Sequence, residues 1–300
     1  MIVVKRGYQS EGGRVFKSAI DTSHGAIAYI DTRGTGVPLV MVHANSLCKE
    51  EFTPQIKVLS GVRRVIAFDL PGHGSSENAK DPGRTYNMSG YADALLEALE
   101  RMTVNRFLAL GHSLGGHVVL EMIAKNAAID GAMIFGTPPI VNSVEGVQAG
   151  FKPSPEMAYT GSPILSDDQV LMVAELALGP DGAEEFFLNA VRRTDGSARQ
   201  LMIESALRGE GSNQRRTAET SPVPLAVVNG ENDPVINLDY IDSLHFANIW
   251  GGEPIRVKGA GHAVHWEQAT RFNELLLRFE DFVNGGRILA QEAEVHCAGL

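Results

Sequence analysis

The chain has 300 residues, of which 44% are hydrophobic and 21% are charged, and its formal net charge at pH 7 is −10. These values are typical of a globular protein with a large buried core. A nucleic-acid-binding surface needs clustered lysines and arginines, and here the arginines form only isolated pairs, so no nucleic-acid partner is expected. The pairs are Arg63-Arg64, Arg192-Arg193 and Arg215-Arg216.

The sequence also lacks signals for export or membrane insertion. No stretch approaches the ~18 apolar residues of a membrane span, and Met1–Gly7 has neither a sustained apolar run nor a small-residue cleavage site. A disulfide between Cys48 and Cys297 is formally possible, but two reduced thiols are the favoured interpretation. We therefore expect a cytoplasmic protein with no membrane partner.

Short apolar segments predict the strands. Two alternating segments, Arg14–Ile20 and Ala26–Asp31, flank the turn residues His24-Gly25, which predicts an antiparallel hairpin. The apolar runs that follow are nearly unbroken, as in strands of a parallel sheet that are buried on both faces. These runs are Pro38–His43, Val65–Phe68, Phe107–Leu110, Ala132–Phe135, Leu225–Val228 and Ile255–Val257.

Helical patterns fall between these strands. Tyr86–Arg101, Leu114–Asn126 and Gln268–Val283 have helical character. Strands that alternate with helices form βαβ units. The predicted fold class is therefore α/β, with a mostly parallel, doubly wound sheet.

Residues 140–222 break this alternation because they contain no buried-strand pattern. We predict that they form a helical cap inserted between two parts of the core, residues 1–139 and 223–284, with residues 285–300 as a C-terminal tail. The cap's predicted helices are Ser166–Leu178, Ala183–Arg193 and Ala198–Leu207.

The run Gly111-His112-Ser113-Leu114-Gly115-Gly116 joins a predicted strand directly to a predicted helix. A serine on such a sharp turn exposes its hydroxyl above the sheet, and the glycines two residues before and after it relieve crowding. A Gly-x-Ser-x-Gly pattern alone is a weak signal, but this placement makes it a strong one. Ser113 is the predicted catalytic nucleophile.

A serine hydroxyl needs a base that removes its proton, and that base needs a partner. In this arrangement the chain order is serine, acid, histidine. Asp233, after the strand Leu225–Val228, is the predicted acid, and Glu231 is its competitor. His262, on a glycine-rich loop after Ile255–Val257, is the predicted base. The other acids and histidines considered are assigned structural or solvent-exposed positions: Asp239, Asp242, His24, His112, His117, His245, His265 and His296.

Acyl transfer also needs two N–H donors for the developing oxyanion. The amide of Leu114, at a helix N-terminus, is one candidate. The amide of Asn45, in the loop after the first parallel strand, is the other. The alternative is that Asn45 only caps the helix predicted at Glu50–Leu59. The loop Asp69–Ser75 is interpreted as a structural brace for the site.

No metal or cofactor is expected. The close histidine pair His262 and His265 lacks the carboxylates that would surround a metal centre. The sequence contains neither a Gly-x-Gly-x-x-Gly after a strand nor a phosphate loop, so no nucleotide cofactor is implied.

Together these motifs resemble the α/β-hydrolase superfamily over nearly the whole chain. Five shorter segments are similar to those of the serine-dependent, metal-free N-acyl-homoserine lactonases of bacteria. Several of them lie in the cap, the most variable part of the superfamily, which makes the similarity more informative. The segments are Asp69–Ser75, Gly136–Pro139, Arg193–Gly196, Gly211–Arg215 and Ala226–Gly230.

The resemblance implies the α/β-hydrolase fold and opening of the lactone ring of quorum-sensing signals. It assigns the chemistry to Ser113, Asp233, His262 and Asn45, which the residues alone had already indicated. Two positions depart from the pattern. Ala44 stands where the superfamily usually has glycine, and the acid is Asp233 where the lactonases have glutamate.

The expected substrate is a small acyl ester or lactone that acylates Ser113. The alternatives are a general carboxylesterase, a carbon–carbon bond hydrolase, or a ligand receptor on the same fold with little turnover. Apolar cap residues are expected either to line an acyl channel or to pack the cap helices together. The candidates are Met157, Tyr159, Met172 and Phe186, with Leu171, Leu176 and Phe187 as further members.

Overall fold

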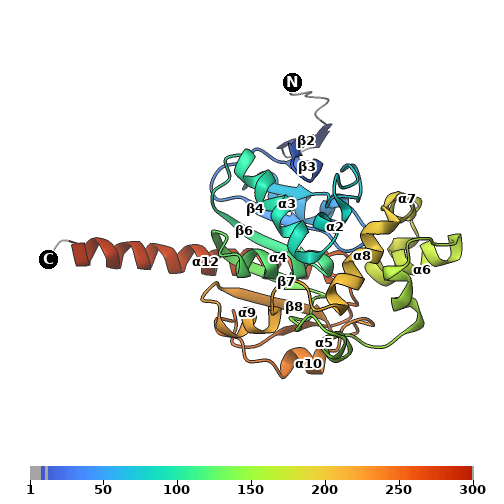
Figure 1. Cartoon of the computed structure of the whole chain (residues 1–300). Helices are drawn as coiled ribbons and strands as arrows, with labels where there is room; N and C mark the ends of the chain where they lie inside the picture. The colour runs from blue at the N-terminus through green and yellow to red at the C-terminus, as the bar shows by residue number, and fades with distance from the viewer. Residues whose placement is uncertain (1–7, 11–12, 299–300) are drawn as a thin grey trace.

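The computed structural model describes residues 8–10 and 13–298, and a sheet of nine strands forms the centre of that part (Figure 1). The strand order is β1-β2-β3-β5-β4-β6-β7-β8-β9. Strands β4 to β9 pair in parallel, whereas β1, β2 and β3 join the edge antiparallel. The predicted α/β class is confirmed. The strands are β1 (Tyr8–Ser10), β2 (Gly13–Thr22), β3 (Gly25–Asp31), β4 (Leu39–Val42), β5 (Val65–Phe68), β6 (Phe107–His112), β7 (Ile129–Phe135), β8 (Leu225–Gly230) and β9 (Ile255–Val257).

The N-terminal hairpin is also confirmed. β2 and β3 pair in register from Phe16 opposite Asp31 to Thr22 opposite Gly25. The short edge strand β1 was not predicted. The predicted absence of a signal peptide concerns residues 1–7, which lie outside the described residues.

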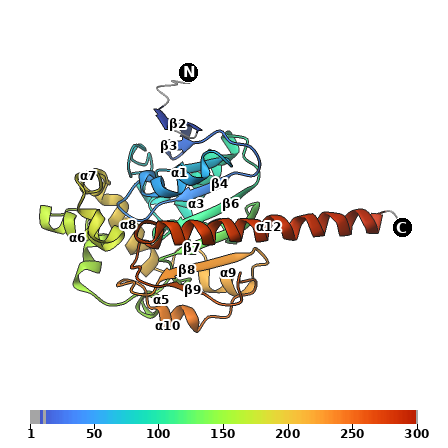
Figure 2. The ribbon, with the colours of Figure 1, turned by 180° about the vertical axis from the view of Figure 1, so that it is seen from behind.

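Helices cover both faces of the sheet (Figures 1 and 2). Before the cap region they are η1 (Lys49–Phe52), α1 (Thr53–Leu59), α2 (Pro82–Thr85), α3 (Met88–Arg101) and α4 (Leu114–Ala124). Between β7 and β8 they are α5 (Val144–Gly150), η2 (Pro155–Gly161), α6 (Asp167–Leu178), η3 (Gly179–Ala183), α7 (Glu185–Arg193), α8 (Gly196–Leu207) and α9 (Gln214–Thr220). After β8 they are α10 (Leu238–Asp242), α11 (Val264–Glu267) and α12 (Ala269–Ala298).

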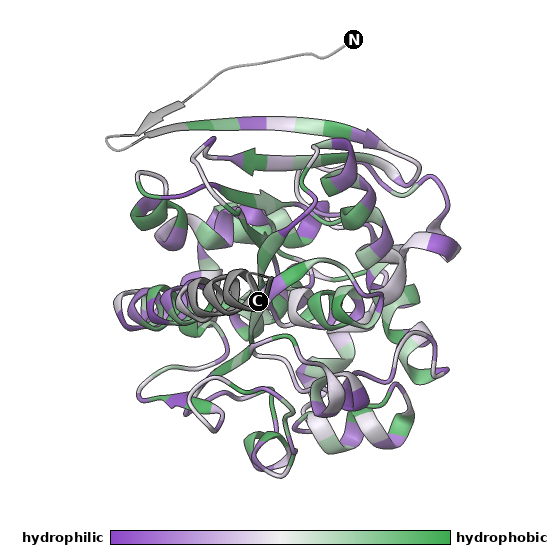
Figure 3. Ribbon diagram, turned by 90° about the vertical axis from the view of Figure 1, so that its left-hand side faces the viewer, coloured by the Kyte–Doolittle hydropathy of each residue, from purple (hydrophilic) through white to green (hydrophobic). Residues whose placement is uncertain are grey.

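The side chains of the parallel strands divide the core into two layers. In β4, Val40 and Val42 pack with α3 and α4, while Leu39 and Met41 pack with α1 and α12. Strands β4 and β5 are therefore apolar at every position, and the strands in the middle of the sheet are largely green in Figure 3. Alternating side chains lie on opposite faces of a strand, so an unbroken apolar run requires cover on both sides.

The segment between β7 and β8 is helical, and its helices α6, α7 and α8 lie together at one end of the molecule (Figure 1). They dock on the loop after β5. Arg193 donates to the Ser76 carbonyl oxygen (2.6 Å), and the Tyr86 hydroxyl donates to the Asp195 carboxylate (2.8 Å). α9 falls within the predicted cap range but packs on α4.

The last helix is longer than predicted. The apolar pattern predicts a helix that stops near Val283, but α12 continues through Gly285-Gly286 to Ala298 and projects from the body (Figure 2). The residues after the glycines include Leu, Ala, Gln and Glu, which favour helix. No helix within residues 8–10 and 13–298 combines the length and the apolar content that crossing a bilayer requires.

The turn between β6 and α4 depends on two glycines. A Cβ added to Gly111 would lie 2.5 Å from the carbonyl oxygen of Gly115. A Cβ added to Gly115 would lie 1.9 Å from the carbonyl oxygen of Val42, at the end of β4. The first turn of α4 therefore packs directly on the backbone of β4, which explains why this turn needs glycine on both sides of Ser113.

Gly115→Ala is predicted to destabilise the protein because the backbone of β4 cannot move away as a flexible side chain could. The loss should lie at the upper end of the roughly 1–3 kcal/mol that overpacking costs, measured by urea denaturation. Gly285→Ala is the matched control, since nothing lies within 4 Å of the added Cβ and alanine favours helix. Equal stability of the two variants would contradict the close contact.

Candidate active site

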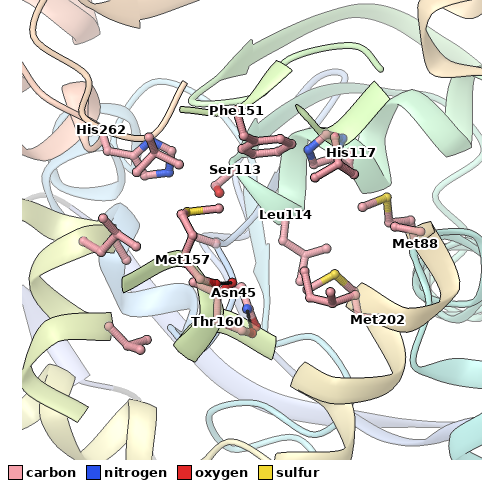
Figure 4. Close-up of a pocket in the computed structure, with 18 of the residues that line it drawn as sticks. Asn45, Met88, Ser113, Leu114, His117, Phe151, Met157, Thr160, Met202 and His262 are labelled. Carbon is pink, nitrogen blue, oxygen red and sulfur yellow. Dashed lines mark hydrogen bonds between the residues drawn. The ribbon is translucent and has the colours of Figure 1, made fainter. Parts of the chain in front are cut away.

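The predicted site residues come together where the parallel strands end. Ser113 follows β6, Asn45 follows β4, and His262 follows β9, and all three line one cavity with Leu114 (Figure 4). Asp233 follows β8 and lies behind His262. Loops at the carboxyl ends of neighbouring parallel strands converge, which is why residues so far apart in sequence meet.

Ser113 has a strained backbone. Its φ is 50° and its ψ is −114°, a region that non-glycine residues rarely adopt. Its amide donates to the Phe135 carbonyl oxygen (2.9 Å), and its own carbonyl oxygen accepts from the Thr137 hydroxyl (2.9 Å). The serine is thus held between β6 and β7, with its hydroxyl directed into the cavity (Figure 4).

Asp233 and His262 form a buried pair. His262 Nδ1 lies 2.9 Å from Asp233 Oδ2, and Asp233 Oδ1 accepts hydrogen bonds from the amides of Val235 (2.8 Å) and Ile236 (3.1 Å). Burial alone would raise the pKa of Asp233, but His262 and the two amides lower it below its ordinary value. A carboxylate so placed accepts a hydrogen bond from Nδ1–H and leaves His262 Nε2 free to accept a proton.

The competing acids lie elsewhere. Glu231 is exposed, two residues from the buried Asp233. Asp239 and Asp242 lie on α10, as expected, and both pair with Arg256. The geometry therefore singles out Asp233 as the partner of His262.

The loop after β4 presents the second predicted oxyanion donor. The Asn45 side chain does not cap a helix, because η1 begins at Lys49 with Cys48 as its N-cap residue. Asn45 Nδ2 instead donates to the carbonyl oxygen of Thr160 in η2 (2.8 Å). The loop that carries the Asn45 amide is thereby tied to the segment between β7 and β8.

The other predicted donor, the Leu114 amide, opens helix α4. Amides in the first turn of a helix have no intrahelical acceptor. Since α4 packs on the end of β4, this amide and the Asn45 loop border the same cavity.

The loop Asp69–Ser75, predicted to brace the site, contacts the segment that follows the Asn45 loop. Asp69 is buried and accepts hydrogen bonds from the Lys49 amide (2.8 Å) and the Ser75 amide (2.8 Å). Its carboxylate also forms a buried ion pair with Lys49 Nζ at 2.6 Å. Cys48, beside them, is a buried free thiol.

Three of the four predicted acyl-channel residues do not line the cavity. Met157 does, together with Leu176, which was also a candidate. Tyr159 instead packs beside α6 and α7, and Met172 and Phe186 are 41% and 52% exposed. The packing of η2, α6 and α7 turns these residues away from the cavity, and their apolar character alone could not reveal this. The apolar lining also includes Met88, Ile140, Val147, Phe151, Met202 and Ile203.

A buried polar cluster that the sequence did not predict lies behind the catalytic loops. His112 Nδ1 is 3.0 Å from Glu51 Oε1, and His112 Nε2 is 3.2 Å from the His262 carbonyl oxygen. The Ala44 amide donates to the Glu51 carboxyl group at 3.3–3.4 Å. His265 Nε2 lies 3.7 Å from Glu51. The cluster thus connects the Asn45 loop with the His262 loop.

The hydrogen bonds of His112 define where its proton lies. A carbonyl oxygen only accepts, so His112 Nε2 carries hydrogen toward His262. Burial raises the pKa of Glu51 well above its usual range and lowers that of His112 well below. Burial thus favours the neutral form of both groups, in which the Glu51 carboxyl group donates a hydrogen bond to His112 Nδ1.

The side chains of Glu51, His112 and His265 could also hold a metal ion, because their ligand atoms lie within 4.8 Å of one another. Two imidazoles and one carboxylate form a common set of metal ligands. The Glu51 carboxyl hydrogen at Nδ1 and the ring hydrogen on Nε2, however, give both nitrogens of His112 a hydrogen-bond partner without an ion.

The fold and this geometry agree with comparisons against known proteins. A profile of the alpha/beta hydrolase family matches residues 39–275. The chain belongs to the alpha/beta hydrolase family.

This hydrolase is similar to the crystal structure of N-acyl homoserine lactonase AidH complexed with N-butanoyl homoserine. The TM-score is 0.86 and the identity 40%, covering 89% of this chain and 97% of AidH. A mutant of AidH complexed with N-hexanoyl homoserine matches equally well, with a TM-score of 0.86 and 40% identity. The resemblance to N-acyl-homoserine lactonases is therefore confirmed.

More distant relatives have other names. The dihydrolipoyllysine-residue acetyltransferase component of an acetoin cleaving system from Pseudomonas putida is 27% identical over 250 residues, which cover 81% of this chain and 63% of that protein. The match thus spans less than two thirds of that relative. A 2-hydroxy-6-oxononadienedioate/2-hydroxy-6-oxononatrienedioate hydrolase from Pseudomonas sp is 24% identical, over 72% of this chain and 76% of that protein.

Two variants of Glu51 test the buried cluster. Glu51→Leu leaves His112 Nδ1 without a partner, so the free energy of unfolding should fall by roughly 1–3 kcal/mol. Glu51→Gln can donate to His112 and accept from Ala44, so it should remain within about 1 kcal/mol of the parent protein. Urea denaturation measures both. Stoichiometric divalent metal in the purified protein, or equal loss in the two variants, would contradict this hydrogen-bonded arrangement.

Proposed function

We propose that this hydrolase opens the lactone ring of N-acyl-homoserine lactones through a serine nucleophile. The observation that carries the proposal is the pairing of His262 with Asp233 beside a cavity that also holds Ser113 (Figure 4). A nucleophile, a base and an orienting acid together are the machinery of acyl transfer. The similarity to AidH over nearly its full length supports the choice of lactone.

In the first step, Ser113 Oγ attacks the lactone carbonyl carbon while His262 Nε2 takes the hydroxyl proton. The amides of Asn45 and Leu114 donate to the oxyanion that forms. Asp233 holds the imidazole in the Nδ1–H tautomer and stabilises the imidazolium. The strained backbone of Ser113 and its place in the cavity lining support this role for its hydroxyl.

The intermediate then collapses, and the ring C–O bond breaks as His262 returns the proton to the alcohol oxygen. Because the alcohol belongs to the same ring, it stays attached to the acyl group on Ser113. In the second step His262 removes a proton from water, and the resulting attack releases an N-acyl-homoserine and free Ser113. The product is the lactone plus one water.

The lining of the cavity supports an acyl substrate. Apart from the catalytic groups it is made mostly of Met, Ile, Leu, Val and Ala side chains, which favour an alkyl chain. The segment 140–222 contributes many of them, so we propose that it acts as the cap that selects the acyl group. Silencing of quorum-sensing signals would follow from such hydrolysis.

Matched carboxylate variants test the assignment. Asp233→Asn should lower kcat for lactone opening by about 10⁴-fold, as expected when the acid that orients the base becomes an amide. Glu231→Gln should leave it unchanged because Glu231 is exposed and does not contact His262. Ser113→Ala should abolish turnover while the fold is retained, as circular dichroism can verify.

Mass spectrometry of the product is the readout, and a single product heavier than the lactone by one water is expected. Release of a free fatty acid would instead indicate an amidase. Substantial turnover by Ser113→Ala would refute the nucleophile.

A further inference from the structure

The proposed mechanism does not use two polar residues of the cavity lining, His117 and Thr160. The other polar side chains there are Asn45, Ser113 and His262. Thr160 donates its hydroxyl proton to the carbonyl oxygen of Met157 (2.7 Å). Sequence analysis assigned His117 a structural or solvent-exposed position, but the structure places it in the cavity wall (Figure 4).

A buried relay fixes the tautomer of His117. Glu121 accepts hydrogen bonds from the amide (3.1 Å) and hydroxyl (2.9 Å) of Ser212 and from Nε2 of Gln214 (3.0 Å). The Gln214 amide group is thereby oriented with its nitrogen toward Glu121 and its oxygen toward His117. His117 Nδ1 lies 2.6 Å from Gln214 Oε1. Because an amide oxygen only accepts, Nδ1 carries the hydrogen.

The remaining ring nitrogen is therefore an acceptor. Burial lowers the pKa of His117 to about 4, so the ring is neutral and Nε2 has a free lone pair. Within the described part of the chain, no hydrogen bond to Nε2 is formed by protein groups. The ring lies near Phe151 and Met88 in an otherwise apolar region (Figure 4). An acceptor left unpaired in such a place is costly unless a ligand supplies a donor.

The position of His117 indicates which part of a substrate supplies that donor. The His117 amide donates to the Ser113 carbonyl oxygen (3.2 Å), which places His117 about one helical turn, roughly 5–6 Å, along the α4 axis from Ser113. Both residues line the same cavity. In an N-acyl-homoserine lactone, five bonds separate the lactone carbonyl carbon from the third carbon of the acyl chain. An extended chain of that length spans about 6 Å.

We propose that His117 Nε2 accepts a hydrogen bond from a hydroxyl group on the third carbon of the acyl chain, so that 3-hydroxyacyl-homoserine lactones are the preferred substrates. The inference rests on the proposed function and specifies its substrate class. An unsubstituted chain leaves the lone pair unpaired. A ketone at the same carbon directs its own lone pairs against that of Nε2. The order of preference is hydroxyl, then methylene, then ketone.

The test compares three lactones of equal chain length: N-(3-hydroxyhexanoyl), N-hexanoyl and N-(3-oxohexanoyl) homoserine lactone. The hydroxylated substrate should have a kcat/KM about tenfold or more above the unsubstituted one, between the effect of one neutral hydrogen bond and that of an unpaired buried acceptor. The ketone should be the slowest. Ratios measured on one preparation do not depend on the fraction of folded enzyme.

His117→Phe keeps a ring of similar shape without the acceptor. In this variant the kcat/KM values of the hydroxylated and the ketone substrates, each divided by that of the unsubstituted lactone, should both approach one. Turnover of the unsubstituted lactone should persist. If His117→Phe does not fold, affinities of the three lactones for Ser113→Ala protein, measured by calorimetry, should show the same order.

The outcomes separate the two proposals. Equal kcat/KM for all three lactones, or a preference that survives in His117→Phe, overturns the role of His117 and leaves lactone opening intact. Failure to open or bind any of the three overturns both the substrate class and the proposed function.

Discussion

The contact between the first turn of α4 and the end of β4 is the constraint on which the whole site depends. Gly115 lies so close to the Val42 carbonyl oxygen that no side chain fits between them. This approach forces Ser113 into a left-handed backbone conformation and directs its hydroxyl away from the sheet. It also brings the N-terminus of α4 beside the Asn45 loop, so one packing contact positions the proposed nucleophile and the proposed oxyanion donors.

Around this contact, buried hydrogen bonds define the tautomers of three histidines, His262, His112 and His117. Asp233 places the proton of His262 on Nδ1, and the Glu51 carboxyl places that of His112 on Nε2. Gln214 Oε1 accepts a hydrogen bond from His117 Nδ1 and so places the proton of His117 on Nδ1. A neutral imidazole is either donor or acceptor at each nitrogen. Buried partners outside the cavity therefore decide what each of these rings offers to its surroundings, including His117 and His262, which line the cavity.

The sequence predicted the features that depend on local pattern. Unbroken apolar runs such as Leu39–Val42 indicated strands covered on both faces, and the glycines beside Ser113 indicated a turn without space for side chains. The order of Ser113, Asp233 and His262 along the chain was enough to bring them together, because each directly follows a strand of one parallel sheet. The hairpin β2–β3 followed from simple alternation.

Features that depend on the orientation of a helix or on distant contacts were missed. Glu51 has the sequence context of a solvated acid near a helix start, and its contact with His112 spans 61 residues. Tyr159, Met172 and Phe186 are as apolar as Met157, but only the packing of the cap helices decides which of them faces the cavity. His117 was given no role in the cavity because Gln214, its partner, is 97 residues away.

The most direct measurement of the central claim is the mass of the intact protein, quenched within one turnover of an N-acyl-homoserine lactone. A lactone keeps its alcohol when the ring opens, so the protein should gain the full mass of the lactone, and peptide mapping should place that mass on Ser113. Turnover with no covalent adduct, or an adduct on another residue, would contradict the account.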